Sequence, residues 1–170
     1  MKTADANIDG EQVRLRLLAE DDLALTLAWR NRDGVRRWFR QSAMIDIEAH
    51  RAWFREHQLG DDALMFIVEE VATGEAVGQV SIYSIDRETG EAEVGRFIAA
   101  PNASGKGYIR AAIIALTKFA FDALSLERVY LEVFASNERA IRLYASVGFI
   151  PFKSTDGCDD MMLMEMKKPS

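Results

Sequence analysis

The chain has 170 residues, which is the size of one domain, since compact domains commonly span about 100–200 residues. Apolar residues make up 49% and charged residues 28% of the sequence, so disordered, collagen-like and coiled-coil proteins are excluded. The formal charge of −6 disfavours nucleic acid as a partner, because phosphates repel an acidic chain. We therefore expect a single folded domain over residues 1–170.

The cysteine and histidine content argues against a metal site. Cys158 is the only cysteine, and with two histidines the chain lacks the ligands of a Cys/His zinc site. Residues 1–12 contain no apolar run, and the longest apolar stretches, such as Ala111–Leu116, are far shorter than the roughly 20 residues of a membrane span. We expect a cytoplasmic protein with no metal and no membrane partner.

The first half of the chain predicts two helices and four strands. A strand with alternating polarity is expected at residues 13–17, and helices at about 20–30 and 47–60. Asp46 suits the N-cap of the second helix and Gly60 its end. Three runs of β-type residues follow, Leu64–Val71, Val77–Ile85 and Glu91–Ala99, separated by the turn pairs Thr73-Gly74 and Thr89-Gly90. Such short turns predict an antiparallel meander.

The second half of the chain alternates helices and strands. A long amphipathic helix is expected from Lys106, because apolar residues recur at helical spacing as far as Leu124. A strand, a short helix and a hairpin complete the chain: Val129–Phe134, Asn137–Ser146, and Phe149–Phe152 with Met161–Met166 around a turn at Asp156-Gly157. This order predicts an α/β fold with a mixed sheet of about seven strands flanked by about four helices.

The segment Pro101–Tyr108 joins a strand to the long helix and contains Gly105 and Gly107. Glycines let the backbone approach a ligand closely, and a helix N-terminus presents unpaired N–H groups to an anion. The segment is interpreted as an anion cradle or, alternatively, as a tight turn with glycines for steric reasons alone. Arg110 replaces the third glycine of a dinucleotide fingerprint, and Lys106 is not followed by Ser or Thr, so neither common nucleotide motif fits.

A second informative stretch covers residues 131–149. Strand alternation places Glu132 on one face together with Tyr130 and Phe134. Glu132 is then either a base on a covered face or an ordinary solvated acid. Asn137 suits the cap of the short helix, and Tyr144 on that helix is either a core aromatic or a hydroxyl directed into a cleft.

Together these two stretches resemble the GNAT superfamily of acetyl-CoA-dependent N-acetyltransferases. The second motif is complete as Asn137, Ala140, Leu143, Tyr144, Gly148 and Phe149, and the first is present as Asn102, Gly105 and Gly107. The match spans about Glu91 to Phe152, and the order of elements agrees over nearly the whole chain. The resemblance implies a GNAT-type fold and acetyl-CoA as co-substrate, with no metal required.

The resemblance also implies a role for each matched residue. The pantetheine arm of coenzyme A would bind the backbone of Phe97, Ile98 and Ala99, and its pyrophosphate that of Ser104, Gly105, Lys106, Gly107 and Tyr108. Asn137 would contact the pantetheine region, and Tyr144 would lie next to the thioester sulfur. Asn102 stands where Arg or Gln is usual and Ile109 where a small residue is common, so the contacts to the phosphates are expected to differ.

Acyl transfer to an amine requires a proton acceptor and a proton donor. An alkyl amine of pKa near 10.4 is neutral in roughly one molecule in a thousand at pH 7, so a base matters. The resemblance assigns this role to Glu132, with Glu93 on the preceding strand as the reserve. Tyr144 would protonate the leaving thiolate, and the ordinary pKa values of about 10 for tyrosine and 8.5 for a thiol make that step only slightly uphill.

The acceptor side is expected after the first helix. Residues 30–40 contain five arginines and one aspartate, which suggests either recognition of an anionic acceptor or a solvated basic loop. The candidate substrate-binding residues are Trp29, Arg30, Asn31, Arg36 and Glu93. His50 and His57 are interpreted as surface residues rather than catalysts.

The pattern of this region resembles the GNAT branch that acetylates amines of nucleotide-linked sugars, and also the ribosomal-protein N-terminal branch. The leading hypothesis is an N-acetyltransferase acting on a small-molecule amine, such as a nucleotide-linked amino sugar. The alternatives are a protein N-terminal acetyltransferase and a GNAT module that binds coenzyme A without turnover. Retention of both Glu132 and Tyr144 argues against the last. A homodimer is compatible with the sequence.

Overall fold

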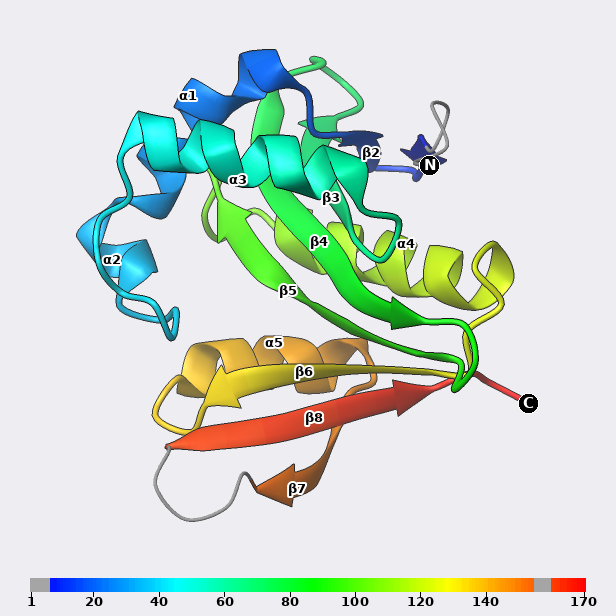
Figure 1. The fold of residues 1–170 in the computed structure, drawn as a ribbon. Helices are drawn as coiled ribbons and strands as arrows, with labels where there is room; N and C mark the ends of the chain where they lie inside the picture. Colours follow the sequence, from blue (N-terminus) through cyan, green and yellow to red (C-terminus); the bar gives the residue numbers. More distant parts are fainter. Residues whose placement is uncertain (1–6, 155–159) are drawn as a thin grey trace.

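The computed structural model describes residues 7–154 and 160–170, and within them one eight-stranded sheet of order β1-β2-β3-β4-β5-β6-β8-β7 (Figure 1). The strands are β1 (Ile8–Asp9), β2 (Val13–Leu17), β3 (Leu64–Glu70), β4 (Ala76–Asp86), β5 (Glu91–Ala99), β6 (Arg128–Phe134), β7 (Ile150–Ser154) and β8 (Met161–Lys167). The helices are η1 (Glu20–Asp22), α1 (Leu23–Arg30), α2 (Asp33–Arg36), α3 (Ile47–Leu59), α4 (Tyr108–Asp122) and α5 (Glu138–Val147).

This topology confirms the mixed α/β sheet. Strands β3, β4 and β5 form the antiparallel meander, β5 and β6 pair in parallel, and β7 and β8 form a hairpin. The described residues contain one strand and one α-helix more than predicted. β1 is only two residues long, and α2 is a single turn within the segment interpreted as a basic loop. The expected turn at Asp156-Gly157 and Cys158 lie outside the described residues.

Helices cover both faces of the sheet. α4 packs on one face through residues such as Ile113 and Leu116, which join a core with Phe66 of β3. α1 and α3 cover the other face, where Trp29 and Phe54 pack with Ile67 of β3. Because β3 lies between the two helix layers, its side chains are buried on both faces, and its run of apolar residues shows no alternation.

The sheet opens between β5 and β6. The two strands pair only from Glu91 with Arg128 to Glu93 with Tyr130, and beyond these residues they diverge, with α5 beside the opening (Figure 1). The pairing register between β4 and β5 also shifts near this opening. Gly95 and Ile98 are three residues apart on β5, but their partners on β4, Ser81 and Gln79, are only two residues apart. This geometry is a β-bulge, which bends a strand and re-aims its side chains.

The bulge contains Arg96, which has a left-handed φ of 54°. It places Phe97 against the α4 core and Ile98 in the opposite cluster, with Trp29. Without the extra residue, Phe97 would share the face of Glu93. The local irregularity therefore decides which side chains of β5 reach each side of the opening.

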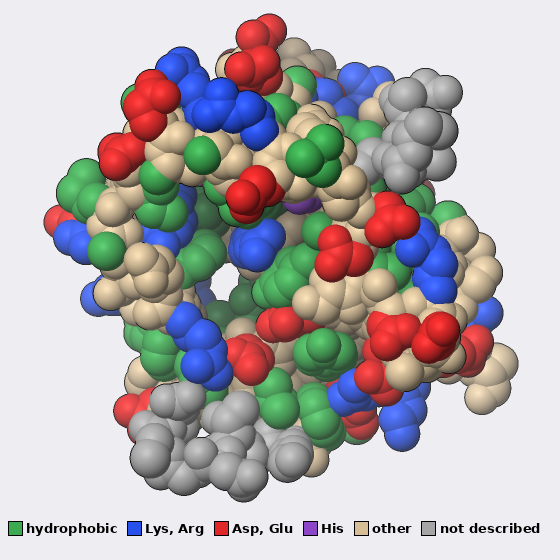
Figure 2. All heavy atoms as spheres, viewed as in Figure 1, with side chains coloured by type: hydrophobic (Ala, Val, Ile, Leu, Met, Phe, Trp, Pro, Cys, Tyr) green, Lys and Arg blue, Asp and Glu red, His purple; other side chains and the backbone are tan. Residues whose placement is uncertain are grey.

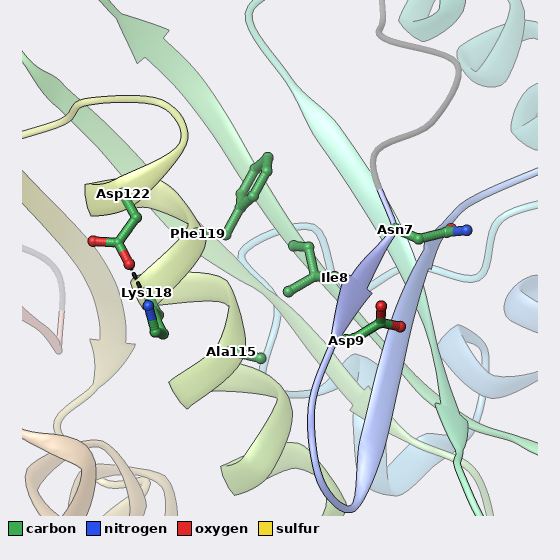
Figure 3. Close-up of a pocket in the computed structure, with 7 residues that line it drawn as sticks. All are labelled: Asn7, Ile8, Asp9, Ala115, Lys118, Phe119 and Asp122. Carbon is green, nitrogen blue, oxygen red and sulfur yellow. Dashed lines mark hydrogen bonds and ion pairs between the residues drawn. The ribbon is translucent and has the colours of Figure 1, made fainter.

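A shallow groove lies away from this opening, between β1 and α4 (Figure 3). Ile8 and Phe119 line it, and Lys118 and Asp122 form an ion pair at its edge. Among the described residues, no helix combines the length and apolar character needed to cross a membrane.

Candidate active site

Tyr144 is held at the opening by the short helix α5. The Asn137 side chain caps this helix as predicted, since its Oδ1 accepts a hydrogen bond from the Ala140 N–H at 3.3 Å. The half-buried Tyr144 ring lies between Phe97, with ring centroids 5.7 Å apart, and Phe149, at 6.3 Å. Burial raises the pKa of Tyr144 above its ordinary value, so transfer of its proton to a thiolate is more uphill in this environment than the ordinary pKa values predict.

The glycine loop keeps its backbone open. Gly105 and Gly107 have φ values of 81° and 82°, and a Cβ added at either position would meet nothing within 4 Å. A side chain at either position would therefore not clash with the rest of the protein. Glycine is favoured at both positions because the backbone is left-handed there. Gly107 precedes α4 without a side-chain cap, so the first N–H groups of this helix remain available to an anion. This geometry fits the pyrophosphate of coenzyme A.

Two arginines that the sequence interpretation missed lie around this loop. The Arg139 Nη2 atom donates to the Ser104 Oγ atom at 3.3 Å, and Arg110 of α4 donates to the Ser146 carbonyl at 3.2 Å. Arg139 lies two residues after the cap of α5, a spacing that could have drawn attention to it. Both bring positive charge to the place where phosphates are expected.

The two departures from the family motif have different surroundings. Asn102 is exposed. Ile109 instead packs against β4, because its Cδ1 atom would lie 2.8 Å from a Cβ at Gly78. Gly78 therefore makes room for the larger side chain of Ile109 at the start of α4. The carbonyl of Ala99, in the expected pantetheine segment, already accepts a hydrogen bond from Arg32.

The two candidate bases lie on one face of the sheet, with different partners. Glu132 is paired with Arg40, whose Nε lies 2.9 Å from the Glu132 Oε2. Glu93 is half-buried and accepts a hydrogen bond from the Tyr83 hydroxyl. Burial, followed by the charge of Glu132, raises the pKa of Glu93 above its ordinary value. Glu132 is thus neither freely solvated nor unpaired, and Glu93 has the more perturbed environment.

Arg96 lies on the same face, directly after Gly95 in the bulge. Its guanidinium Cζ is 4.3 Å from the centroid of the Tyr83 ring and 5.9 Å from that of Trp53 on α3. Trp53 is stacked between His50 and His57, which are half-buried rather than fully on the surface. The sequence interpretation did not single out Arg96, and regular strand alternation would place it on the other face; an arginine within an apolar strand is the signal that could have identified it.

The structure gives most of the predicted acceptor residues supporting roles. Trp29, a candidate substrate-binding residue, is 3% exposed and part of the hydrophobic core, so its side chain packs within the protein instead of facing an acceptor. Asn31 exchanges two hydrogen bonds with the backbone of Ile45. Arg36 donates to Asp33 and to the Ser42 carbonyl. These contacts order the chain between α1 and α3.

Arg30 differs from these residues. It is 8% exposed, and its Nη1 atom has no hydrogen-bond partner among the described residues. Its guanidinium stacks on the Phe39 ring at 4.4 Å and donates to the Gln41 carbonyl. Burial and the charge of Arg36 lower the pKa of Arg30.

The two groups of residues meet at the opening of the sheet. Tyr144 and the glycine loop lie on the α4 side, and Glu93, Glu132 and Arg96 on the α3 side. The molecule is hollowed between the part formed by α3, β4 and β5 and the part formed by β6 and β8, with charged and hydrophobic side chains around the hollow (Figure 2). No group of three His, Cys, Asp or Glu side chains suited to a metal ion occurs within residues 7–154 and 160–170.

Comparison with known proteins agrees with this geometry. The family model of the acetyltransferase (GNAT) domain matches residues 12–150. Spermidine N(1)-acetyltransferase of Escherichia coli K12 is 30% identical over 81% of this chain and 72% of its own length. The Vibrio cholerae spermidine N(1)-acetyltransferase is 27% identical over 82% and 79%. A crystal structure of spermidine N-acetyltransferase from Vibrio cholerae with CoA and spermine superposes with a TM-score of 0.82 at 24% identity, covering 93% of this chain and 96% of that one.

Proposed function

Because this chain belongs to the GNAT acetyltransferase family and is an acetyl-CoA-dependent amine N-acetyltransferase, we propose that it acetylates a primary amine of a small molecule by direct transfer, with Glu93 as base and Tyr144 as acid. One observation carries the proposal. The opening between β5 and β6 has Tyr144 on one side and Glu93 on the other. An amine and a thioester would approach each other from opposite faces of the sheet.

Each residue has a defined task in this reaction. Acetyl-CoA supplies the acetyl group as an activated thioester. Glu93 takes a proton from the amine as its nitrogen bonds to the acetyl carbon, and Tyr144 gives its proton to the sulfur as the carbon–sulfur bond breaks. The proton held by Glu93 then restores the Tyr144 hydroxyl through solvent, so protons balance over one turnover.

The surroundings favour Glu93 over Glu132 as the base. A base acts best when its pKa approaches the working pH, and burial moves Glu93 in that direction. Glu132 commits one carboxylate oxygen to Arg40 at 2.9 Å. Its negative charge helps to raise the pKa of Glu93, so Glu132 acts by tuning the base.

The oxyanion formed by the acetyl oxygen requires hydrogen-bond donors. The edge of β5 beyond Glu93 has no pairing to β6, so backbone N–H groups between Val94 and Ala99 are available on that side. Phe97, turned toward Tyr144 by the bulge, lies in this segment. The backbone near Phe97 is therefore the proposed donor for the acetyl oxygen and for the pantetheine arm.

The relatives favour a polyamine as a second candidate acceptor, since two of them are spermidine N(1)-acetyltransferases. The test is release of free thiol from acetyl-CoA in the presence of separate amines: spermidine, an amino sugar, a nucleotide-linked amino sugar and a peptide with a free N-terminus. Amine-dependent thiol release with a small amine supports the proposal. Activity on the peptide alone, or none above the rate without amine, overturns it.

A further inference from the structure

The guanidinium of Arg96 lies against two aromatic rings and makes no hydrogen bond or ion pair within the described residues, although its charge acts on Glu93. The side chain is half-buried and held against the rings of Tyr83 and Trp53. Within the described part of the chain, no carboxylate lies within ion-pair distance of Arg96 and none of its N–H groups has a hydrogen-bond acceptor. The guanidinium nitrogens of Arg96 are not among the buried unpartnered atoms of the described residues, so they reach solvent at the opening, and this fork of donors matches the geometry of a carboxylate or phosphate.

The backbone of Arg96 is also strained. Its φ of 54° is left-handed, which costs an ordinary L-residue roughly 1–2 kcal/mol. Glycine would avoid this cost, and glycine does occupy the preceding position, Gly95. A non-glycine residue that keeps such a conformation at the edge of an active site is often retained for its side chain.

The carboxylates near Arg96 are already committed. Glu132 is paired with Arg40, and Glu93 accepts a hydrogen bond from Tyr83. Arg30, behind this face, adds a second buried cation that makes no ion pair within the described residues. The charges of Arg96 and Arg40 both act on Glu93, and of these two arginines only Arg40 has an ion pair among the described residues.

We propose that Arg96 forms a subsite for an anionic group of the acceptor, so that the amine substrate also carries a carboxylate or a phosphate. The inference rests on the proposed function, because it places the amine at Glu93 and the anion at Arg96 on the same strand. Three residues of strand span at most roughly 10 Å, which sets the scale of the separation between amine and anion. A polyamine would instead bring its additional ammonium groups toward Arg96 and Arg40.

Matched amines test this inference. Lysine and cadaverine differ by a carboxylate, and glucosamine 6-phosphate and glucosamine differ by a phosphate, so the two pairs distinguish the anion sources. Initial rates at saturating acetyl-CoA give kcat/KM for each amine and for spermidine. We expect at least one anionic member to exceed its neutral or cationic counterpart by about 10–100-fold, the worth of a charge-assisted pair of hydrogen bonds.

The variant is Arg96→Gly, which removes the guanidinium and also relieves the left-handed φ, so that folding is preserved. Because Arg96 also lowers the pKa of Glu93, rates are compared on the plateau above the acid limb, where the variant should lower the ratio of kcat/KM for the anionic amine to that for its counterpart by about 10–100-fold. Arg87→Gln is the matched control, since Arg87 is exposed in the turn after β4 and loses the same charge. Equal loss for both members of a pair, or a preference for spermidine, overturns the inference.

A binding measurement separates this inference from the transferase proposal. Isothermal titration of glucosamine 6-phosphate and of lysine into wild-type protein and Arg96→Gly, with CoA present, needs no turnover. Binding that disappears in Arg96→Gly supports the anion subsite even if no amine is acetylated, a result that would reject the proposed function alone. If neither anion binds, or if both bind equally to the variant, the subsite is rejected.

Discussion

The ring of Tyr144 on α5 packs against the ring of Phe97 on β5, with centroids 5.7 Å apart. This contact exists because the bulge at Arg96 turns Phe97 toward the α4 side of the sheet. The same bulge directs the Arg96 side chain toward Tyr83 and Trp53 on the opposite side. One extra residue in β5 thereby places a proposed acid and a proposed acceptor subsite on the two faces of one opening.

Replacing Tyr144 with Phe should lower kcat by about one to three orders of magnitude. The variant lacks the proton that is proposed to reach the sulfur, but retains the ring that packs on Phe97 and Phe149. Titration calorimetry with CoA should therefore show affinity within about 2-fold of wild type, and thermal unfolding should be nearly unchanged. An unaltered kcat would remove Tyr144 from the mechanism.

Replacing Glu93 with Gln should lower kcat/KM by about 10²–10⁴-fold, whereas Glu132→Gln should have a smaller effect. The base must be deprotonated, and the pKa of Glu93 is raised, so wild-type activity should rise with pH through a limb that lies above the ordinary range of a glutamate. That limb should be absent in Glu93→Gln. If the acid limb of the pH profile disappears in Glu132→Gln and persists in Glu93→Gln, the base is Glu132 and not Glu93.

Two neighbours of Glu93 should shift the acid limb of the pH profile of kcat/KM in opposite directions. Arg40 lowers the pKa of Glu93 and Glu132 raises it. Arg40→Gln should therefore shift the acid limb of kcat/KM to higher pH, and Glu132→Gln should shift it to lower pH. Arg87→Gln, an exposed arginine in the turn after β4, should leave the limb in place. Parallel shifts in both variants would contradict the proposed electrostatic coupling.

Replacing Gly107 with Ala should weaken acetyl-CoA binding beyond its effect on stability. Gly107 has a φ of 82° and Gly74, in the turn between β3 and β4, has a φ of 75°; a Cβ meets nothing within 4 Å at either site. Each alanine should therefore cost about 1–2 kcal/mol of folding free energy, measured by urea unfolding. Only Gly107→Ala should raise the KM for acetyl-CoA, because its Cβ would occupy the open face of the loop. Equal KM values for the two variants would place the phosphates elsewhere.

Much of the fold was predictable because it follows local patterns. The meander, the helix α4 and the hairpin β7–β8 follow from alternation, helical spacing and turn residues. The caps at Asp46 and Asn137 were also predicted, since a side chain that caps its own helix depends on neighbours only three residues away. β1 and α2 were missed, because elements of two and four residues are too short to show a period.

The site was predictable on one side of the sheet only. The glycine loop and Tyr144 belong to contiguous motifs, so the family resemblance carried by those motifs could imply a role for each. Arg96 was missed because a bulge reverses the face of every later residue, and strand alternation assumes regular pairing. Trp29 was misjudged for a related reason: an aromatic residue at the end of a helix is buried here by packing with Phe54 and Ile67.

The amino-acid sequence by itself determined most of the secondary structure, the glycine loop and the family resemblance, because each depends on residues close together along the chain. Only the tertiary structure distinguishes the two candidate carboxylates, since the pKa of Glu93 depends on burial, on charges from β5, β6 and the segment after α2, and on a hydrogen bond from β4. It also decided that Arg96 packs on Tyr83 and Trp53 and has no ion pair within the described residues, because that depends on every element packed around it. Burial and through-space charge are properties of the assembled fold, and no spacing in the chain encodes them directly.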